Sequence, residues 1–394
     1  MSAWKECKLA AIAEIVMGQS PKGESCNQIG NGFPLLNGPT EFGIKYPQAI
    51  QYTIEPTRIS KVGDILFCVR GSTTGKMNWS DKEYVIGRGL AAIRHRDGND
   101  LQSFVKGIID FNLSTLLARA TGSTFPNIAR EQLESLDIYL PPLPEQRAIA
   151  SVLSSLDDKI DLLHRQNKTL EAMAETLFRQ WFVEEADEGW EEKPLSEIIS
   201  VKHGYAFKGG EISDQKNSNI LVTPGNFKIG GGFKGEKYKY FVGESFPDEY
   251  RFIANDLVVT MTDLSVDTDT LGYPAFIPQS KEFIYLHNQR VGKVNFQDDH
   301  IEWKYFVYFT LRTDEYRQYI IGSASGTSIM HTSPDRICAY ICHFPTKNII
   351  EEFNTILEPI YSKISYNTMN IQLLISLRDT LLPKLMSGEV RVEI

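Results

Sequence analysis

The sequence predicts a mixed α/β (α+β) protein in which two similar globular domains are separated by two long antiparallel helices. Two observations carry this prediction. Apolar residues between Pro144 and Phe182 recur at spacings that alternate between four and three, which is the heptad pattern of a coiled coil. The long helix also reappears 204 positions later in the chain, and the globular part repeats at an offset that drifts from 186 to 204, which indicates an internal repeat with pseudo-two-fold symmetry.

The first long helix is expected over residues 143–185. Pro144 suits a first helical turn, and Glu145 suits the positive end of the helix dipole. A seam from 149 to 181 would be roughly 48 Å long. An amphipathic helix packed on a single core fits less well, because such helices usually stop after roughly 8–20 residues. The seam positions are Ile149, Leu153, Leu156, Ile160, Leu163, Asn167, Leu170, Ala174, Leu177 and Trp181.

The second long helix is expected over residues 346–388, and its seam contains Asn367. An antiparallel pairing about a pseudo-two-fold near residue 165 places Asn167 opposite Asn367, whereas a parallel pairing would separate them. A buried Asn pair reduces stability but fixes the register, so we expect these two residues to set it. Pro359 removes one helical hydrogen bond and predicts a kink or a fresh start there. The same symmetry brings the chain ends together and predicts tolerance to circular permutation.

The globular domains are expected at 1–142 and 186–345, with a short tail at 389–394. In the first domain, strands are expected at 64–69, 84–86, 90–93 and 136–140, and a helix at 101–118. The second domain follows the same plan: Gly204 corresponds to Gly18 and Arg290 to Arg88. The strands agree between the two copies and the loops differ, which predicts one scaffold carrying two different binding surfaces.

Composition and charge restrict the class of protein. The chain has no run of 18 apolar residues, so we expect no membrane span, and its five cysteines suggest free thiols in a reducing cytoplasm. The net charge is −9, but it is unevenly distributed. Residues 1–140 carry 15 Lys+Arg against 14 Asp+Glu, whereas residues 141–190 carry 5 against 10. Local basic patches are therefore available in the domains and not on the helices.

No motif in the sequence supports catalysis or a metal site. Residues 71–76 resemble a phosphate-binding loop but are one residue short, and Met77 replaces the required Ser or Thr. Cys338 and Cys342, placed on one strand, would lie about 13 Å apart, which is too far for one ion. The Glu302-Trp-Lys304 sequence is nuclease-like by chance. We therefore expect no catalytic residue, no metal and no cofactor.

Polar loops remain at matching points of the two domains. Ser, Thr and backbone N–H groups position phosphates, while Arg, Asn and Gln read base edges. Each such loop is also compatible with an ordinary surface loop. The candidate DNA-binding residues are Arg70, Ser72, Thr73, Thr74, Lys76, Arg88, Thr121, Ser123, Thr124 and Asn127 in the first domain, and Thr262, Asn288, Gln289, Arg290, Ser325, Thr327, Ser328 and His331 in the second.

Motifs on both helices resemble the specificity (S) subunits of type I restriction-modification systems. Residues 140–147 (LPPLPEQR), 153–160 (LSSLDDKI) and 177–182 (LFRQWF) are similar to the central conserved region of that family. Residues 382–390 (LPKLMSGEV) are similar to its distal conserved region. The resemblance covers the whole chain, and it is specific for the helices and less so for the domains.

The resemblance implies a non-catalytic subunit with two target recognition domains. Each would read one half of a bipartite site in double-stranded DNA. The helix pair would set the spacing and dock two modification subunits, which bring S-adenosylmethionine and methylate adenine; restriction subunits can join for ATP-dependent cleavage. We expect the acidic residues Asp157, Asp158, Asp161, Glu171 and Glu175 on the outer helix faces, toward a protein partner or solvent. The alternative function is a two-headed protein–protein scaffold without DNA affinity.

Overall fold

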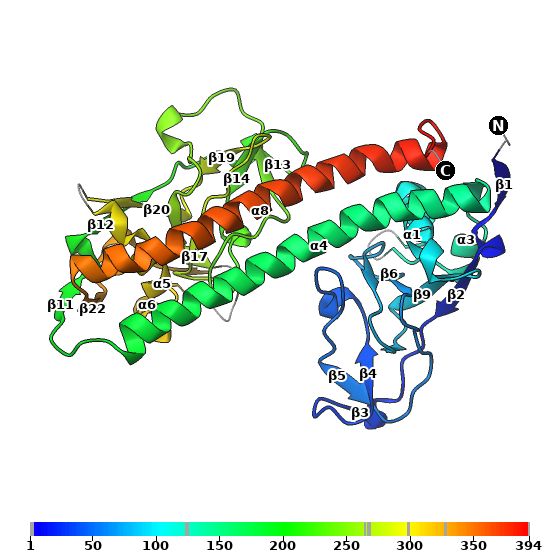
Figure 1. Ribbon diagram of the computed structural model, residues 1–394, viewed down its shortest axis with the longest axis horizontal. Coiled ribbons are helices and arrows are strands. Elements are labelled where there is room, and N and C mark those ends of the chain that lie inside the picture. Colours follow the sequence, from blue (N-terminus) through cyan, green and yellow to red (C-terminus); the bar gives the residue numbers. More distant parts are fainter. Residues whose placement is uncertain are drawn as a thin grey trace. The chain divides into compact units, whose positions relative to one another are not determined.

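The computed structural model describes residues 4–122, 126–263, 265, 269–297, 300–326 and 329–392 (Figure 1). The chain divides into two compact units. The first consists of Met1–Leu162 and Gln372–Ile394, and the second of Leu163–Ile371. Both long helices, α4 (Leu143–Arg179) and α8 (Lys347–Ser387), contribute a segment to each unit. We call the remaining part of each unit its head.

The first head contains two four-stranded sheets and a strand pair. In the first sheet all neighbours are antiparallel; its order is β2 (Ala13–Met17), β9 (Leu90–His95), β6 (Ile65–Cys68) and β7 (Met77–Trp79). The second sheet, in which β4 and β8 are parallel, has the order β3 (Cys26–Asn27), β5 (Gln51–Thr53), β4 (Phe33–Leu36) and β8 (Val85–Ile86). The separate pair is β1 (Lys5–Lys8) with β10 (Asp137–Leu140).

Three helices complete the first head: α1 (Gln102–Phe111), α2 (Leu113–Arg119) and α3 (Arg130–Glu134). The single helix expected at 101–118 is therefore two helices. The break falls at Asn112, whose side-chain amide donates to the Ile108 carbonyl at 2.9 Å. Such a bond from side chain to backbone competes with helical continuation. The predicted strands at 64–69, 90–93 and 136–140 are confirmed as β6, β9 and β10.

The second head repeats this strand order. Its first sheet is antiparallel: β12 (Ile199–His203), β20 (Val291–Phe296), β16 (Leu257–Thr260) and β18 (Pro274–Phe276). Its second sheet contains the parallel pair β14–β19, in the order β13 (Ile212–Ser213), β15 (Lys239–Phe241), β14 (Asn219–Val222) and β19 (Ile284–His287). Two strand pairs follow, β11 (Glu191–Pro194) with β22 (Ile341–Phe344) and β17 (Thr262–Asp263) with β21 (Met330–His331). The helices are α5 (Lys304–Thr310), α6 (Asp314–Ser323) and α7 (Pro334–Cys338).

The predicted heptad seam is the buried face of the long helices. None of the seam positions of α4 is exposed, and Ile149 and Ala174 are almost completely buried. The helices run antiparallel within each unit. In the first unit Glu145 pairs with Arg391, and Asp157, twelve residues later in the chain, pairs with Arg378, which precedes Arg391. The antiparallel prediction is confirmed.

The expected fresh start at Pro359 is wrong, because α8 is a single helix from 347 to 387. Leu357 is fully buried and Ile360 packs against the same core, so the apolar face continues past the proline. Packing of an amphipathic face supplies most helical stability in proteins, and here it outweighs one missing hydrogen bond.

Several acidic side chains expected to face outward instead bind cations within their own unit. Asp158 pairs with Lys45 at 2.7 Å in the first unit. In the second unit, the guanidinium of Arg312, whose side chain is only 10% exposed, pairs with Glu171 and Glu175, both at 2.9 Å. These ion pairs hold a head onto the long helix of its unit and give three of the acidic residues of α4 a partner within the protein.

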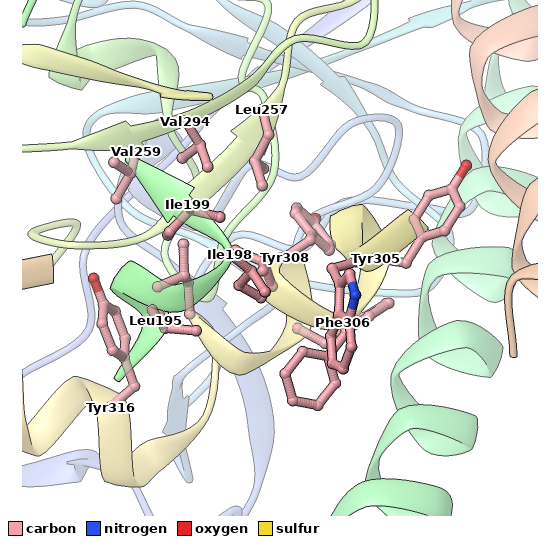
Figure 2. Close-up of a cluster of buried hydrophobic side chains, with 14 of the residues drawn as sticks. Leu195, Ile198, Ile199, Leu257, Val259, Val294, Tyr305, Phe306, Tyr308 and Tyr316 are labelled. Carbon is pink, nitrogen blue, oxygen red and sulfur yellow. The ribbon is translucent and has the colours of Figure 1, made fainter. Parts of the chain in front are cut away.

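The main core of the second unit lies between its antiparallel sheet, α5 and the long helices. Figure 2 shows Leu257, Val259 and Val294 from the sheet facing Tyr305, Phe306 and Tyr308 of α5. The aromatic core extends into the helix pair, where Phe182 of the π-helical turn Gln180–Glu184 contacts Phe353 edge to face at 4.8 Å between ring centroids. The head is thus packed onto the seam through aromatic rings.

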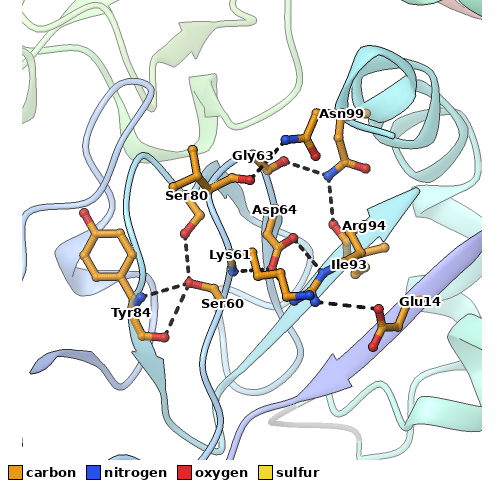
Figure 3. A network of polar contacts seen from close by, with 12 residues as sticks. Glu14, Ser60, Lys61, Gly63, Asp64, Ser80, Tyr84, Ile93, Arg94 and Asn99 are labelled. Carbon is orange, nitrogen blue, oxygen red and sulfur yellow. Dashed lines mark hydrogen bonds and ion pairs between the residues drawn. The ribbon is translucent and has the colours of Figure 1, made fainter. Parts of the chain in front are cut away.

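The first head contains a buried ion pair. Arg94 on β9 donates two hydrogen bonds to Asp64, at 2.9 and 2.6 Å, and Glu14 lies 3.6 Å from the same guanidinium (Figure 3). The Lys61 backbone N–H also donates to Asp64 at 2.7 Å. Burial raises the pKa of Asp64, although Arg94 opposes that shift. The pair ties the start of β6 to β9.

The first and last described segments of the chain lie together. The guanidinium of Arg391 lies 5.6 Å from the centre of the Trp4 ring. Both residues belong to the first unit. This contact agrees with the pseudo-two-fold arrangement expected from the sequence.

Candidate nucleic-acid interface

Three polar loops of the first head meet where β6 ends. Residues 70–76 follow β6, residues 87–89 precede β9, and residues 120–127 come after α2. Val69 donates a backbone hydrogen bond to Gly89, and Ile128 donates one to Val69, both at 2.9 Å. Loops that are distant in the sequence are thereby joined at one edge of the head.

The loops at 70–76 and 120–127 are also bridged directly. Asn127 exchanges backbone hydrogen bonds with Thr121, at 3.0 and 2.8 Å, and forms a β-bridge with Arg70. Gly71 donates to the Pro126 carbonyl at 3.1 Å. The sequence identified these loops separately, and the fold brings them together.

The second head reproduces this arrangement. Met261 donates to Arg290, and Thr332 donates to Met261, both at 3.0 Å. Ser325 and His331 exchange backbone hydrogen bonds at 3.0 and 2.8 Å, as Thr121 and Asn127 do in the first head. The same set of contacts therefore builds both loop clusters.

These hydrogen bonds correct the correspondence read from the sequence. Gly89 and Arg290 play the same backbone role, so Arg88 corresponds to Gln289 and not to Arg290. The alignment of the two heads by sequence was wrong by one residue at this turn, because the loops that precede it differ in length between the heads. The backbone hydrogen bonds give the correct alignment.

Several candidate side chains are exposed at the loop clusters. In the part of the chain that the structure describes, Arg70, Lys76, Arg88 and Arg290 have no carboxylate within ion-pair distance. The other exposed candidates are Ser72, Thr121, Gln289, Ser325 and His331. Cations without a carboxylate partner beside hydroxyl and amide groups are suited to binding an anionic polymer.

Other candidates are used inside the protein. The Thr74 hydroxyl donates to Gly71 at 2.7 Å and to Pro126 at 2.9 Å, so it supports the loop junction. Thr262 is buried with its hydroxyl 3.1 Å from His331 Nδ1, and buried Asn288 accepts from the Arg290 N–H at 3.1 Å. Half-buried members are Thr73, whose hydroxyl lies 3.7 Å from Cys68 Sγ, and Asn127. Ser123, Thr124, Thr327 and Ser328 lie outside the described residues.

A fourth loop, residues 18–22, was not among the candidates. Gly18 donates to Leu90 at 2.9 Å, and Ser20 Oγ accepts from the Arg88 N–H at 3.3 Å. A Cβ on Gly18 would lie 2.1 Å from the Gly87 carbonyl oxygen, so only glycine permits this approach. Lys22 is exposed on this loop.

The corresponding loop in the second head is residues 204–208. Tyr205 donates to His287 at 2.8 Å and accepts from Gln289 at 3.0 Å. A Cβ on Gly204 would lie 2.3 Å from the Asn288 carbonyl oxygen. Exposed Lys208 stands at the place of Lys22. The repeated Gly-x-x-x-Lys spacing was the sequence signal that could have identified both loops.

A buried histidine fixes the second-head turn. His287 Nε2 lies 2.8 Å from the Val291 carbonyl, across the turn that carries Gln289 and Arg290. Burial lowers the pKa of His287 to about 4, so its ring is neutral near pH 7 and donates to that carbonyl.

The sequence motifs set aside as non-catalytic are explained by their environment. Strand β7 follows residues 71–76, whereas a phosphate-binding loop requires a helix. Glu302 pairs with Lys347 and Lys304 pairs with Glu358, so the E-x-K residues serve separate ion pairs.

The two C-terminal cysteines lie on different elements. Cys338 ends α7 and Cys342 lies on β22, with a turn between them. Both thiols are partly buried. Within the described ranges no group of three or more His, Cys, Asp or Glu side chains is placed to hold a metal ion.

Comparisons with known proteins agree on one family. A family model described as the type I restriction modification DNA specificity domain matches residues 1–172. The putative type I restriction enzyme MjaX specificity subunit of Methanocaldococcus jannaschii is 37% identical over 40% of this chain. The MjaIX specificity subunit of the same organism is 27% identical over 69% of this chain, and the HindI specificity subunit of Haemophilus influenzae is 23% identical over 84% of this chain and 87% of its own length.

The matches differ in how much of each relative they cover. This chain spans 37% of the MjaX subunit and 65% of the MjaIX subunit. Among solved structures, an S subunit of a type I restriction-modification system from M. genitalium is 18% identical, with a TM-score of 0.59 over 97% of this chain and 96% of that one. This likeness shows that the fold is shared. None of the helices in the described ranges is long and apolar enough to cross a membrane.

Proposed function

We propose that this chain is a specificity (S) subunit of a type I restriction-modification system, the family that its matches share, and that each of its heads reads one half of a bipartite site in double-stranded DNA. The observation that carries the proposal is the loop cluster that both heads repeat. Each cluster exposes guanidinium, hydroxyl or amide groups on backbone segments that are fixed by hydrogen bonds. Groups of this kind position phosphates and read base edges.

The two clusters carry different side chains on one scaffold. The first exposes Arg70, Lys76 and Arg88, and the second exposes Gln289, Arg290 and His331. Different side chains at matching places suit an asymmetric target, in which the two half-sites have different sequences. The target recognition domains are proposed to comprise residues 1–142 and 186–345, with residues 389–394 as the C-terminal tail.

The long helices are proposed to act as a spacer and as a docking element. Residues 143–185 and 346–388 would set the distance between half-sites, and roughly one duplex turn or somewhat more suits a spacer of this length. Two modification subunits would dock on the helices, bring S-adenosylmethionine and methylate adenine. Restriction subunits would join the same assembly, while this chain itself supplies no catalytic group. The free state of all five cysteines supports a place in the reducing cytoplasm.

The test uses the chain assembled with its modification subunits. Methylated positions are mapped by sequencing DNA treated with the complex and S-adenosylmethionine. We expect one bipartite motif, and binding that weakens as salt concentration rises. A chimera that carries residues 1–142 of another family member should change one half of the motif and leave the other unchanged.

The complex without residues 1–142 is not a suitable control, because those residues pack against α4 and α8. A chimera that exchanges only the exposed residues 28–31, which belong to none of the loops of the cluster, is a better one, and its motif should stay as it is. Binding without any sequence preference would contradict the proposal. Absence of DNA binding together with capture of a peptide ligand would favour the protein–protein scaffold.

A further inference from the structure

We propose that Arg88 and Gln289 read different purines at equivalent positions of the two half-sites, Arg88 a guanine and Gln289 an adenine. The inference rests on the proposed function and adds a base assignment to it. It starts from the corrected register of the two loop clusters, in which these residues occupy the same place.

The equivalence follows from the backbone contacts on each side of the two residues. The residue that follows each accepts a hydrogen bond from the end of the central strand segment: Gly89 from Val69 at 2.9 Å, and Arg290 from Met261 at 3.0 Å. On the other side, Gln19 donates to Ile86 and Tyr205 donates to His287, both at 2.8 Å. The turn in each head therefore has the same anchors.

The first-head turn is rigid, and its one long side chain is exposed. Leu90 donates to Gly87 at 3.0 Å, and Gly87 donates to Leu36 at 2.8 Å. The Arg88 N–H donates to Ser20 Oγ at 3.3 Å. The backbone of the turn is thus engaged within the protein, and the Arg88 guanidinium remains for a ligand.

The second-head turn is fixed by more contacts. Val291 donates to Asn288 at 3.0 Å, the Gln289 N–H donates to Tyr205 at 3.0 Å, and His287 binds the Val291 carbonyl. Asn288 is buried, whereas Gln289 is exposed. Because the backbone turn that bears Gln289 is already ordered, it loses little conformational entropy when a ligand binds. This favours the use of the Gln289 side chain in recognition.

The chemistry of the two side chains decides which base each reads. A guanidinium donates two parallel hydrogen bonds to O6 and N7 of guanine, and a Gln amide both donates to N7 and accepts from N6 of adenine. A Gln amide can donate to a phosphate oxygen, but without a charge it holds a phosphate less strongly than Arg does, whereas both side chains form bidentate pairs with a purine. Two such residues at one structural position therefore indicate base reading at that position.

The experiment exchanges the two side chains in the assembled complex. Methylation motifs are mapped for Arg88→Gln and Gln289→Arg beside the unmodified protein. We expect Arg88→Gln to shift the preference at one position of one half-site from guanine to adenine. We expect Gln289→Arg to produce the reverse shift in the other half-site. The discrimination at the affected position should change by about ten- to a hundredfold.

Matched controls lie at the opposite ends of the same strands. Arg96 follows β9 and Gln297 follows β20, and both are exposed away from the loop clusters. Arg96→Gln and Gln297→Arg should leave the motif unchanged, and thermal melting shows whether all four variants are folded.

The outcomes separate the inference from the proposed function. If Arg88→Gln weakens methylation uniformly and the motif keeps its guanine, Arg88 is a phosphate ligand and the inference is overturned while the proposed function stands. A shift in both half-sites from one substitution would also overturn it. If the unmodified complex has no sequence preference, the proposed function itself fails.

Discussion

The side-chain amide of Asn367 donates a 2.9 Å hydrogen bond to the side-chain oxygen of Asn167, across the antiparallel helix pair of the second unit. Asn367 is completely buried, and its amide also donates to Gln166 at 3.1 Å. Asn167 in turn donates to Thr368 at 3.3 Å. The expected Asn–Asn contact is present, and the role of this pair in setting the register of one helix against the other stays a prediction.

This pair should behave as a coupled unit when it is mutated. Asn167→Leu or Asn367→Leu alone leaves a buried amide without its partner and should reduce the free energy of unfolding by about 1–3 kcal/mol. The double variant should lose less than the sum of the two, because no orphan amide remains. Denaturant unfolding of all three variants measures the coupling. Asn370→Leu combined with Asn167→Leu is the control, and it should be additive.

The buried ion pair of the first head should be sensitive to loss of its cation. The Arg94 side chain is 12% exposed and that of Asp64 is 1% exposed. Arg94→Ala leaves the Asp64 carboxylate buried without its counter-ion and should cost about 3–5 kcal/mol of stability. The control is Arg96→Ala, which removes an exposed guanidinium bonded to the Ala10 carbonyl. Equal losses in both variants, measured by denaturant unfolding, would contradict this prediction.

His287 should make the second unit less stable in mild acid. Burial lowers its pKa from 6.5 to about 4; the hydrogen bond to Val291 opposes that shift, and Lys293, Lys202 and His203 add to it. The unfolded chain therefore binds the proton more readily, and stability falls as the pH decreases from about 6.5 toward 4. The loss between pH 7 and pH 5 should be about 2 kcal/mol.

The measurement compares the free energy of unfolding of the second unit in the unmodified protein and in the His287→Gln variant. Both proteins are unfolded in denaturant at pH 7 and at pH 5. The variant is less stable at pH 7 because it loses the fitted ring, but it should lose about 2 kcal/mol less than the protein on acidification. Identical pH dependence in the two would show that His287 is not the titrating group.

Gly18 and Gly204 pack against the turns that carry Arg88 and Gln289. Substituting either glycine should weaken base discrimination in one half-site only. An Ala Cβ at Gly18 would clash with the Gly87 carbonyl oxygen, and one at Gly204 with the Asn288 carbonyl oxygen, so the turn must shift in each case. Gly18→Ala should weaken discrimination in the first-head half-site, and Gly204→Ala in the other. Methylation mapping of the assembled complex tests both.

The glycines that directly follow the two loops, Gly23 and Gly209, serve as matched controls. A Cβ at Gly23 or Gly209 meets no atom within 4 Å, so Gly23→Ala and Gly209→Ala should keep the motif. If Gly23→Ala and Gly209→Ala reduced base discrimination as much as Gly18→Ala and Gly204→Ala do, the clash with the turn would not be the cause of the loss.

A circular permutant should fold and keep its DNA motif. Trp4 and Arg391 are in contact, so a short Gly/Ser linker can join the original ends. The new ends belong at Asp187, which is exposed between α4 and β11. Thermal melting and methylation mapping are the readouts. A permutant that aggregates while a matched chain with the same linker at its original C-terminus stays folded would contradict the pseudo-two-fold arrangement.

The sequence alone determined the long helices, their antiparallel register and the repeated plan of the heads. These features are encoded locally. The apolar spacing within each helix specifies the seam, and the position of one Asn in each seam specifies how the two helices pair. The same holds for strands such as β6, whose apolar β-branched run is evident without any partner.

Tertiary structure decided which loops meet and which side chains of those loops remain exposed. The sequence could not show that Thr262 and Asn288 are buried or that Arg88 corresponds to Gln289. It also placed Glu171 on an outer helix face, toward a protein partner or solvent, whereas the fold pairs it with Arg312. The physical reason is common to all of these cases. Backbone hydrogen bonds and ion pairs between residues far apart in the chain fix the loops, and loops of different length hide those partners from any comparison made along the sequence.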